Sequence, residues 1–498
     1  MKYIDKFKTI YKDWWMSNLD RDYNTKTDPT HLIANSSRYL SEVFNKNNFI
    51  VNDKQQYFGN KETFKYLNMN FWDSDIPFRR LLENDEKVIV QAGLHPITDS
   101  MYPIYDTKRW FFDLFLEPNI VRKMKNGTLV LLLYQGWEAE DYTDEIYSRV
   151  KADKYKTYYD MFRDVLEQYK LPKSSMIILS SNLFGNEHED YGVNVIYDNI
   201  MEWNSLHRGV AKSYAKKMLK ETGHDFRSIN MDYSVDEYLE SIKNNEKRIC
   251  RLSRTKHQQR DWMLYLMKKN NWLNRSLVEQ KFFNRSHIDN DTYTHKTAID
   301  FCNDNWNYND TEKYKYLIDN FKNIDKNIIQ ELETIVPMVA SDYETHPKFK
   351  PDTIHSNLPI PYDVYNKSVF SWVSTSLPDR TDMVFLNQST FNPILFYHPI
   401  VWLGSPRTVE YFKRYGYKSY DWLFESEDKA DKAEIFSHRL LHNLHDINKV
   451  MNMSNDELYN RIKDNKDTLV HNRNLLIRCK SIDRIVTQIY EMIYETEI

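Results

Sequence analysis

A short polar segment near the middle of the chain combines basic and hydrogen-bonding side chains with the spacing of an anion site. Residues 253–260 read SRTKHQQR and lie between a predicted strand, 248–253, and a predicted amphipathic helix. A guanidinium at the carboxyl end of a strand, beside a helix N-terminus, can bind a diphosphate through two hydrogen bonds and stabilise a leaving group. Arg254 is the main candidate for that role, and Arg260 is a second partner or a structural residue. The alternative is a solvated basic face.

A second polar segment, 387–390, follows an apolar run and reads Asn-Gln-Ser-Thr. The run 383–386 predicts a buried strand, and Thr390 is placed to cap a helix whose first turn contains Pro393. Ligands bind at the carboxyl ends of strands in open α/β sheets, because helix N-termini and free backbone N–H groups converge there. The candidate ligand-binding residues of this segment are accordingly Gln388, Ser389 and Thr390.

Ionisable side chains also follow two predicted strands in the first half of the chain. His95 and Asp99 come after the run 87–93, and Glu138 comes after the run 128–134. A carboxylate or an imidazole in such a loop can accept the proton of an attacking hydroxyl, which makes these residues candidate general bases. Each of them could instead cap a helix or hold a loop.

The elements that position these residues alternate between short apolar runs and helical stretches, which predicts parallel sheets covered on both faces. Ser405 and Pro406 begin a predicted helix that Gly416 ends. The predicted strands are 87–93, 128–134, 175–181, 193–197, 248–253, 367–374, 383–386 and 399–403, with helices at 107–126 and 155–170.

The same pattern predicts two domains. We expect a first domain at 1–240 with a helical N-terminal extension, and a second domain at 241–480. Residues 205–246 are charged and helical in pattern, and residues 270–360 are irregular and rich in Asn and Asp. The segment 481–498 is a predicted helix.

The order of motifs over about 365–430 resembles the C-terminal, nucleotide-sugar half of GT-B glycosyltransferases from large viruses and tailed bacteriophages. The shared order is a polar loop, Thr-Phe-x-Pro-Ile, His-Pro before an apolar strand, Gly-x-Pro, a helix, and Gly-Tyr-Lys-Ser-Tyr. The family's loop usually reads Thr-Glu-Lys-Thr-aromatic-Lys-Pro, whereas 387–393 reads NQSTFNP. The acidic and basic positions of that loop are therefore neutral in this chain.

A second point of resemblance lies between the predicted strand 248–253 and the helix after it. The family has Asn-Arg-x-x-Arg-x-His-Arg there, and Arg254 and Arg260 stand at its first and last arginine positions. Ser253, His257 and Gln259 replace the Asn, the middle Arg and the His. At the end of the strand 367–374, Thr375 corresponds to a place where the family often has Glu-Thr, so a second carboxylate is missing.

The resemblance implies an α/β, GT-B-like fold of two Rossmann-like domains with parallel sheets facing a central cleft. It implies transfer of a sugar from a nucleoside diphosphate sugar, such as a UDP-sugar, to a hydroxyl. The donor would bind to the second domain and the acceptor to the first, and the segment 481–498 would return to the first domain as in GT-B enzymes. Beside Arg254 and Arg260, the residues that could bind the donor are Ser253, His257, Thr375, Gln388, Ser389 and Thr390. Thr375, Gln388 and Ser389 could hydrogen-bond it without charge. No metal is obligatory, although a divalent ion remains an option. His95, Asp99 and Glu138 would be the candidate catalytic bases.

The acceptor that we place first is 5-hydroxymethylcytosine in double-stranded viral DNA. An aromatic-rich first domain and the basic clusters at 212–220 and 247–260 could hold a flipped nucleotide. A surface glycan or a lipid-linked sugar is the second choice and needs no basic surface. A third interpretation, from another class, is a catalytically degenerate module that binds nucleic acid or has a structural role. The oligomeric state is left open.

Two further patterns suggest metal sites. Asp73-Ser74-Asp75 matches the short acidic motif of the other large glycosyltransferase fold, GT-A, and also suits a helix cap or a surface turn. His438, His442 and His445 fall on one face of a predicted helix, where they could bind zinc or form a polar helix surface.

Composition sets limits on compartment and partners. The net charge is −4, which gives no global attraction to nucleic acid, and 10 glycines in 498 residues leave no Gly-rich loop for phosphate. The longest apolar runs are too short to span a bilayer, and the N-terminus lacks the features of a signal peptide. Cys250, Cys302 and Cys479 form neither a disulfide framework nor a paired zinc motif. We expect a cytoplasmic protein without membrane contact.

Overall fold

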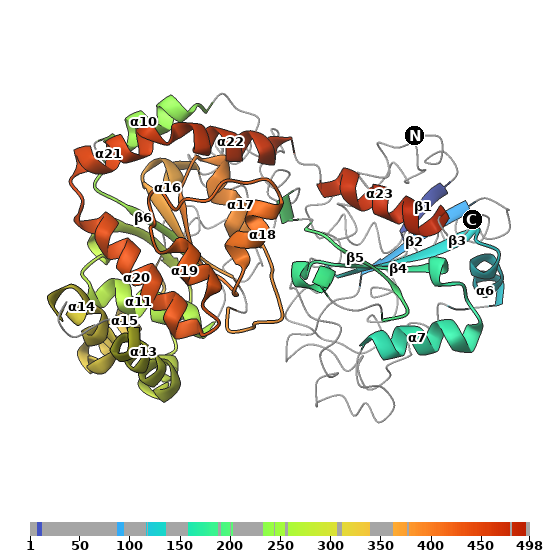
Figure 1. Cartoon of the computed structure of the whole chain (residues 1–498), viewed down its shortest axis with the longest axis horizontal. Coiled ribbons are helices and arrows are strands. Elements are labelled where there is room, and N and C mark those ends of the chain that lie inside the picture. Colours follow the sequence, from blue (N-terminus) through green and yellow to red (C-terminus); the bar gives the residue numbers. More distant parts are fainter. Residues whose placement is uncertain are drawn as a thin grey trace. The chain divides into compact units, whose positions relative to one another are not determined.

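The computed structural model of the chain has two compact units, one formed by residues 1–200 with 480–498 and the other by 201–479 (Figure 1). The predicted boundary lies at 240, whereas α10 (Val235–Lys243) packs on helices of the second unit. The residues that the structure describes are 7–11, 87–93, 116, 118–135, 158–187, 191–199, 201–202, 233–243, 245–253, 257–305, 311–338, 362–375, 378–478 and 481–494.

The described part of the first unit contains one parallel sheet in the order β1-β2-β3-β4-β5. Its strands are β1 (Phe7–Tyr11), β2 (Lys87–Gly93), β3 (Leu129–Gln135), β4 (Met176–Ser180) and β5 (Asn194–Tyr197). The predictions for β2 to β5 are confirmed to within two residues at either end. The sequence did not predict β1. Residues 1–85 have a helical pattern, and Phe7–Tyr11 reads FKTIY, in which Lys8 and Thr9 interrupt the apolar side chains.

The strands of this sheet follow one another in space as they do in sequence. Because crossovers between parallel strands are right-handed, connections that step in one direction lie on one face of the sheet. This is the arrangement of α6 (Pro118–Lys125) and α7 (Tyr158–Tyr169), which share a core with β3 and β4. That core includes Ile120, Met124, Leu131, Phe162, Val165 and Ile178.

The other face of the first sheet is covered by α23 (Ser481–Tyr494), as Figure 1 shows. This helix contacts β5 and the short 3-10 helix η4 (Lys173–Ser175), and its Ile485 and Ile489 are fully buried. Arg484 fixes the helix by donating from Nε and Nη2 to the two carboxylate oxygens of Asp198, at 3.1 and 3.0 Å. Asp198 directly follows β5, so an ion pair joins the helix to the end of that strand.

The second sheet, in the order β7-β6-β8-β9, is also parallel throughout its described strands. The strands are β6 (Ile249–Ser253), β7 (Ser276–Gln280), β8 (Phe370–Ser374) and β9 (Ile400–Leu403). After β6 and β7 the chain crosses back, so that β8 pairs with the other side of β6. The strand order therefore reverses between β6 and β8, which is the point where open α/β sheets bind ligands.

This reversal also sets the helix layers. The crossovers on either side of it step in opposite directions, so α11 (Gln258–Lys269) and α17 (Gln388–Leu395) lie on opposite faces of the sheet. Figure 1 shows α10, α21 and α22 on one side of β6, and α11, α13 and α20 on the other. The remaining helices are α12 (Ser286–Asp289), α13 (Thr292–Asn305), α14 (Thr311–Lys322), α15 (Lys326–Ile335), α16 (Tyr362–Asn366), α18 (Thr408–Arg414), α19 (Glu427–Lys432), α20 (Phe436–Asn452), α21 (Asn455–Asp464) and α22 (Lys466–Ile477).

The α/β class and the two parallel sheets are as the sequence predicts, but the strand predicted at 383–386 is wrong. This segment is buried and pairs with no strand. The reason is that β8 and β9 pair directly with each other, for example Ser371 with Ile400, which leaves no place between them. In the described part of the chain, no helix has both the length and the apolar character needed to cross a membrane.

Candidate functional site

Two hydroxyl side chains lie at the point where the order of the second sheet reverses. Ser253 ends β6, and Thr375 directly follows β8. Ser253 is 6% exposed and Thr375 is 2% exposed, and within the described residues neither hydroxyl has a hydrogen-bond partner. Buried hydroxyls normally have a partner, so two orphaned ones at the carboxyl ends of neighbouring strands point to a ligand at this edge.

The first turn of α11 lies beside these hydroxyls. Gln259 donates from Nε2 to the backbone oxygen of Thr375 over 2.9 Å, which joins the helix to the end of β8. His257 is the N-cap residue in an extended backbone conformation, and its side chain makes no capping hydrogen bond. The helix N-terminus is therefore not closed by its own cap side chain, and its dipole favours an anion there.

The electrostatics of this turn combine a neutral imidazole with buried guanidinium groups. Burial, reinforced by the positive charge of Arg260 and by His287, lowers the pKa of His257 to about 4, so this imidazole is neutral at pH 7. Arg251 on β6 donates from Nη2 to the backbone oxygen of Arg260 at 2.6 Å and to Oε1 of Gln280 at 2.9 Å. Burial lowers the pKa of Arg251 to about 9.

The predicted alternative of a solvated basic face does not hold for the described arginines of 247–260. Arg248, Arg251 and Arg260 are all buried. Arg248 donates from Nη2 to the backbone oxygen of Met453 at 2.7 Å and to Oδ1 of Asn455 at 3.0 Å, so it ties β6 to the end of α20. These side chains hold the fold together rather than present charge to solvent.

The polar segment 387–390 approaches the same edge from the other side. Asn387, and not Thr390 as predicted, is the N-cap of α17, and its Oδ1 accepts from the Thr390 backbone N–H at 3.2 Å. The Asn387 side-chain amide also reaches the backbone oxygen of Ser374 at 3.5 Å. Thr390 is fully buried, Ser389 is half-buried, and Gln388 is the first residue of the helix.

Both polar segments predicted to bind a ligand therefore contact the end of β8. Gln259 of the first segment touches Thr375, and Asn387 of the second touches Ser374. The structure places Ser253 at the end of β6 and Thr375 at the end of the neighbouring β8, with His257 and Arg260 at the start of α11 and Thr390 in the first turn of α17. Arg254, His95, Asp99, Glu138 and the Asp73-Ser74-Asp75 motif lie outside the described residues, and their roles stay predictions.

The helix after β9 offers no comparable site, because the protein fills it. Asp431 accepts the backbone N–H groups of Val409 and Glu410 at 2.7 and 2.9 Å, so a carboxylate of the chain occupies the N-terminus of α18. The predicted end of this helix at Gly416 is confirmed, since Gly416 follows the C-cap with a φ of 89°.

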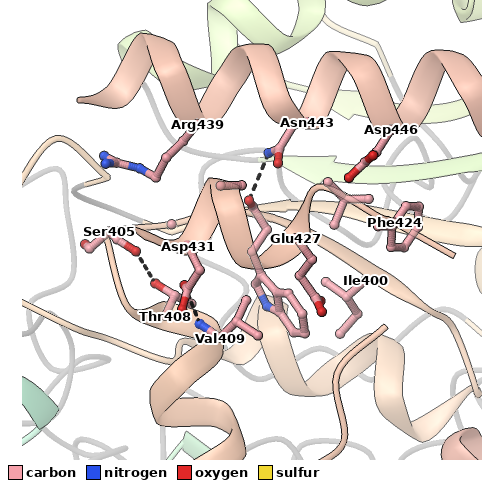
Figure 2. A pocket seen from close by; sticks show the side chains of 14 residues that line it. Ile400, Ser405, Thr408, Val409, Phe424, Glu427, Asp431, Arg439, Asn443 and Asp446 are labelled. Atoms are coloured by element: carbon pink, nitrogen blue, oxygen red, sulfur yellow. Dashed lines mark hydrogen bonds between the residues drawn. The ribbon is translucent and has the colours of Figure 1, made fainter. Parts of the chain in front are cut away.

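A cavity of about 20 Å³ lies between β9 and helices α18, α19 and α20 (Figure 2). Three carboxyl groups line it, and each accepts backbone N–H groups: Asp431 as above, Glu427 from Tyr420, and Asp446 from Ser426. Burial raises the pKa of Asp431 to about 6 and of Asp446 to about 7, and raises that of Glu427 well above its usual value. The space suits a water molecule rather than a substrate.

The histidines of α20 do not form a metal site. His438 stacks on Phe301 with ring centroids 4.0 Å apart, and His442 meets the same ring edge-on at 5.6 Å. Their imidazoles are used in packing α20 against α13, and the described residues contain no cluster of three potential metal ligands. Cys250 and Cys302 are buried free thiols.

Sequence reasoning missed Gln259, Asn387, Arg251 and Asp431. Their partners are backbone atoms or side chains distant in sequence, and only the Asn387 cap carries a local signal, an Asn three residues before a helical Thr.

Comparisons with known proteins add one distant likeness. No protein-family model and no curated protein matches the chain. Among solved structures, the α,α-trehalose 6-phosphate synthase of Burkholderia multivorans is similar over 93% of this chain and 83% of that chain, with 10% identity and a TM-score of 0.34. The description of the fold therefore depends on the two sheets themselves.

Proposed function

We propose that the protein is a glycosyltransferase that moves a sugar from a nucleoside diphosphate sugar to a hydroxyl acceptor. The observation that carries this proposal is the meeting of two segments at the end of β8. Gln259 and Asn387 belong to the two segments whose motifs resemble GT-B enzymes, and both contact this strand end. Segments that resemble the two parts of a donor site thus lie together at the edge where open α/β sheets bind ligands.

The chemistry of this edge suits a donor with a diphosphate. A helix N-terminus attracts an anion, and Arg254, which precedes α11 in the sequence, is the residue that we propose to bind the same group. Ser253 and Thr375 offer hydroxyls that can bind the donor without charge. A UDP-sugar is the first donor to test.

In the proposed reaction, the acceptor oxygen attacks the anomeric carbon and loses its proton to a general base. The bond between that carbon and the β-phosphate oxygen breaks, and the electron pair leaves with the diphosphate. The anion site at α11 stabilises the charge that develops on the leaving group. A divalent ion is not obligatory in this scheme.

The acceptor that we propose first is 5-hydroxymethylcytosine in DNA, as the resemblance suggests. The burial of Arg248, Arg251 and Arg260 takes away part of the basic surface that this acceptor would use. A surface glycan or a lipid-linked sugar is therefore tested beside it, and a module that binds without turnover is the alternative from another class.

The test is to incubate the protein with a panel of nucleoside diphosphate sugars and to measure release of the nucleoside diphosphate without an acceptor. We expect slow hydrolysis of one donor, and faster release when the correct acceptor is added, first hydroxymethylcytosine DNA and then glycans. Salt-sensitive DNA binding with no release from any donor would favour the binding module and contradict the proposal.

Thr375→Val is the matched variant for the site. Its hydroxyl has no partner among the described residues, so replacing it with a methyl group should leave the stability unchanged or raise it. We expect donor affinity to fall by about 10-fold, the effect of one lost hydrogen bond. Unchanged affinity in a folded Thr375→Val protein would remove this edge from the donor site. Thr334→Val on the surface of α15 is the control.

A further inference from the structure

A histidine and a buried aspartate form a pair beside the first turn of α11. Nδ1 of His287, on α12, lies 2.7 Å from Oδ2 of Asp261, on α11. The Asp261 side chain is 3% exposed, whereas the His287 side chain is 29% exposed. The pair thus joins an enclosed carboxylate to an imidazole that solvent can reach, which is the arrangement of an oriented base.

The hydrogen bonds fix the tautomer of His287. Asp261 accepts at Nδ1, so the proton is there and Nε2 carries the lone pair. Nε2 lies 3.2 Å from Nδ2 of Asn284. Oδ1 of Asn284 is held by the backbone N–H and hydroxyl of Ser286, at 3.1 and 2.8 Å, so the amide turns its NH₂ group toward the imidazole. The Asn284 amide therefore occupies the lone pair of Nε2, and an acceptor O–H would take its place there.

The Asp261 carboxylate of this pair is held in place by two further hydrogen bonds. Oδ2 of Asp261 accepts from the Asn284 backbone N–H at 3.2 Å, and Oδ1 accepts from Nε2 of Gln280 at 3.0 Å. Gln280 in turn accepts from Arg251. The positive charges that face the pair are Arg251 from β6 and Arg260 from α11, with Arg285, which pairs with Asp289 and Glu333, on the outside.

The pair lies close to the proposed diphosphate site. Asp261 is one turn from the N-cap His257, and its backbone N–H bonds to the His257 oxygen at 3.4 Å. His287 is near enough to contribute to the lowered pKa of His257. A hydroxyl that approached Nε2 of His287 would therefore arrive at the same end of α11 as the leaving group.

We propose that His287 is the general base of the glycosyl transfer, oriented by Asp261. Nε2 takes the proton of the acceptor hydroxyl, or of water when no acceptor is present. The oxygen forms its bond to the anomeric carbon, and the diphosphate leaves with the electron pair of the broken bond. Asp261 stabilises the imidazolium, which then loses its proton to solvent. This inference rests on the proposed function and assigns the base to the second unit, in place of the first-unit residues His95, Asp99 and Glu138.

The test compares His287→Gln with His471→Gln, a control on α22, in the donor-hydrolysis assay. We expect His287→Gln to lower kcat by about 100-fold or more, while the KM for the donor changes by less than about 3-fold. The control should keep the wild-type rate.

Chemical rescue separates catalysis from structure. His287→Ala should regain part of its rate when free imidazole is added, and Asp261→Asn should show a low kcat with intact donor binding, because its amide holds the wrong tautomer. A folded His287→Gln protein that hydrolyses the donor at the wild-type rate, or a His287→Ala protein that imidazole does not rescue, would overturn the role of His287 alone. No hydrolysis of any donor by the wild type would overturn the proposed function itself.

Discussion

The side chain of Gln259 and the backbone oxygen of Thr375 are joined by a hydrogen bond of 2.9 Å across the point where the second sheet reverses its strand order. Both residues are buried, so the bond is shielded from water. It fixes the first turn of α11 relative to the end of β8, two elements more than 100 residues apart in sequence. The position of the proposed anion site thus depends on one amide.

Replacing Gln259 with Leu should therefore affect stability and binding together. The Thr375 oxygen would lose a buried partner, which costs about 1–2 kcal/mol of the free energy of unfolding. The first turn of α11 would also be less well placed, so we expect nucleoside diphosphate binding to weaken by more than the Thr375→Val change weakens it. Urea unfolding and calorimetric titration with UDP measure the two effects. Asn452→Ala, at the exposed end of α20, should change neither.

Asp446 should make the protein less stable as the pH rises. Burial raises its pKa to about 7, above the usual 3.8, so the folded chain binds this proton more tightly than the unfolded chain. The contribution is complete below about pH 4 and is lost as the pH rises through 7. Asp446→Asn keeps an acceptor for Ser426 and cannot ionise.

We therefore expect the stability of Asp446→Asn relative to the wild type to be about 1–3 kcal/mol greater at about pH 8.5 than at about pH 5. Urea unfolding at both pH values measures the difference. The exposed change Asp428→Asn is the control. The same difference between the wild type and Asp446→Asn at both pH values would mean that Asp446 is ionised without cost.

Arg484→Ala should loosen α23 without unfolding the second unit. The change leaves the buried carboxylate of Asp198 without its bidentate partner, which costs about 3 kcal/mol in the free energy of unfolding. Because the guanidinium is partly exposed, water can enter at this position and reduce the loss. Hydrogen exchange should then become faster over 481–494 and β5, and stay unchanged in α20. The double change Asp198→Asn with Arg484→Met should recover part of the loss, because no unpaired charge is left.

Gly185→Ala should destabilise the first unit because the site has no room for a methyl group. A Cβ at this position would lie 2.0 Å from Cε1 of Tyr197, whose hydroxyl is bonded to that of Tyr159 at 2.5 Å. We expect a loss of about 2 kcal/mol or more in the free energy of unfolding. Gly127→Ala, where no heavy atom lies within 4 Å, tests the positive φ alone and should cost about 1 kcal/mol. A Gly185→Ala protein as stable as Gly127→Ala would show that Tyr197 can move aside.

The strands of this chain are predictable where their burial on both faces produces an unbroken apolar run. The run Leu129–Gln135 is such a case, and its prediction is correct to one residue. Where burial and an apolar run do not coincide, the sequence pattern misses some strands and predicts others that do not form. β7 contains the polar residues Glu279 and Gln280 and was not predicted, although both side chains are buried and Gln280 donates to Asp261 of α11. Residues 383–386 are apolar and buried yet unpaired, because burial can come from packing without a ladder.

The strand ends that position the candidate site are predictable from the sequence, but the hydrogen bonds between its residues are not. Ser253 and Thr375 could be named because strand ends are visible in the sequence. Arg251 could not, because an arginine within a short strand gives no sign that it reaches Gln280 on the next one. His287 likewise shows no pattern with Asp261, since the pair is 26 residues apart and spans two helices.

The sequential strand order of the first sheet has a consequence for how this unit is made. The helices that the structure describes between its strands, α6 and α7, lie on one side, and α23, which is translated after the whole of the second unit, covers the other side at β5. While residues 201–479 are being translated, none of the helices described within 1–200 takes the place of α23. The first unit to be synthesised is therefore the last to complete its fold. A nascent chain of this kind needs either a chaperone or rapid synthesis up to residue 494 to avoid aggregation.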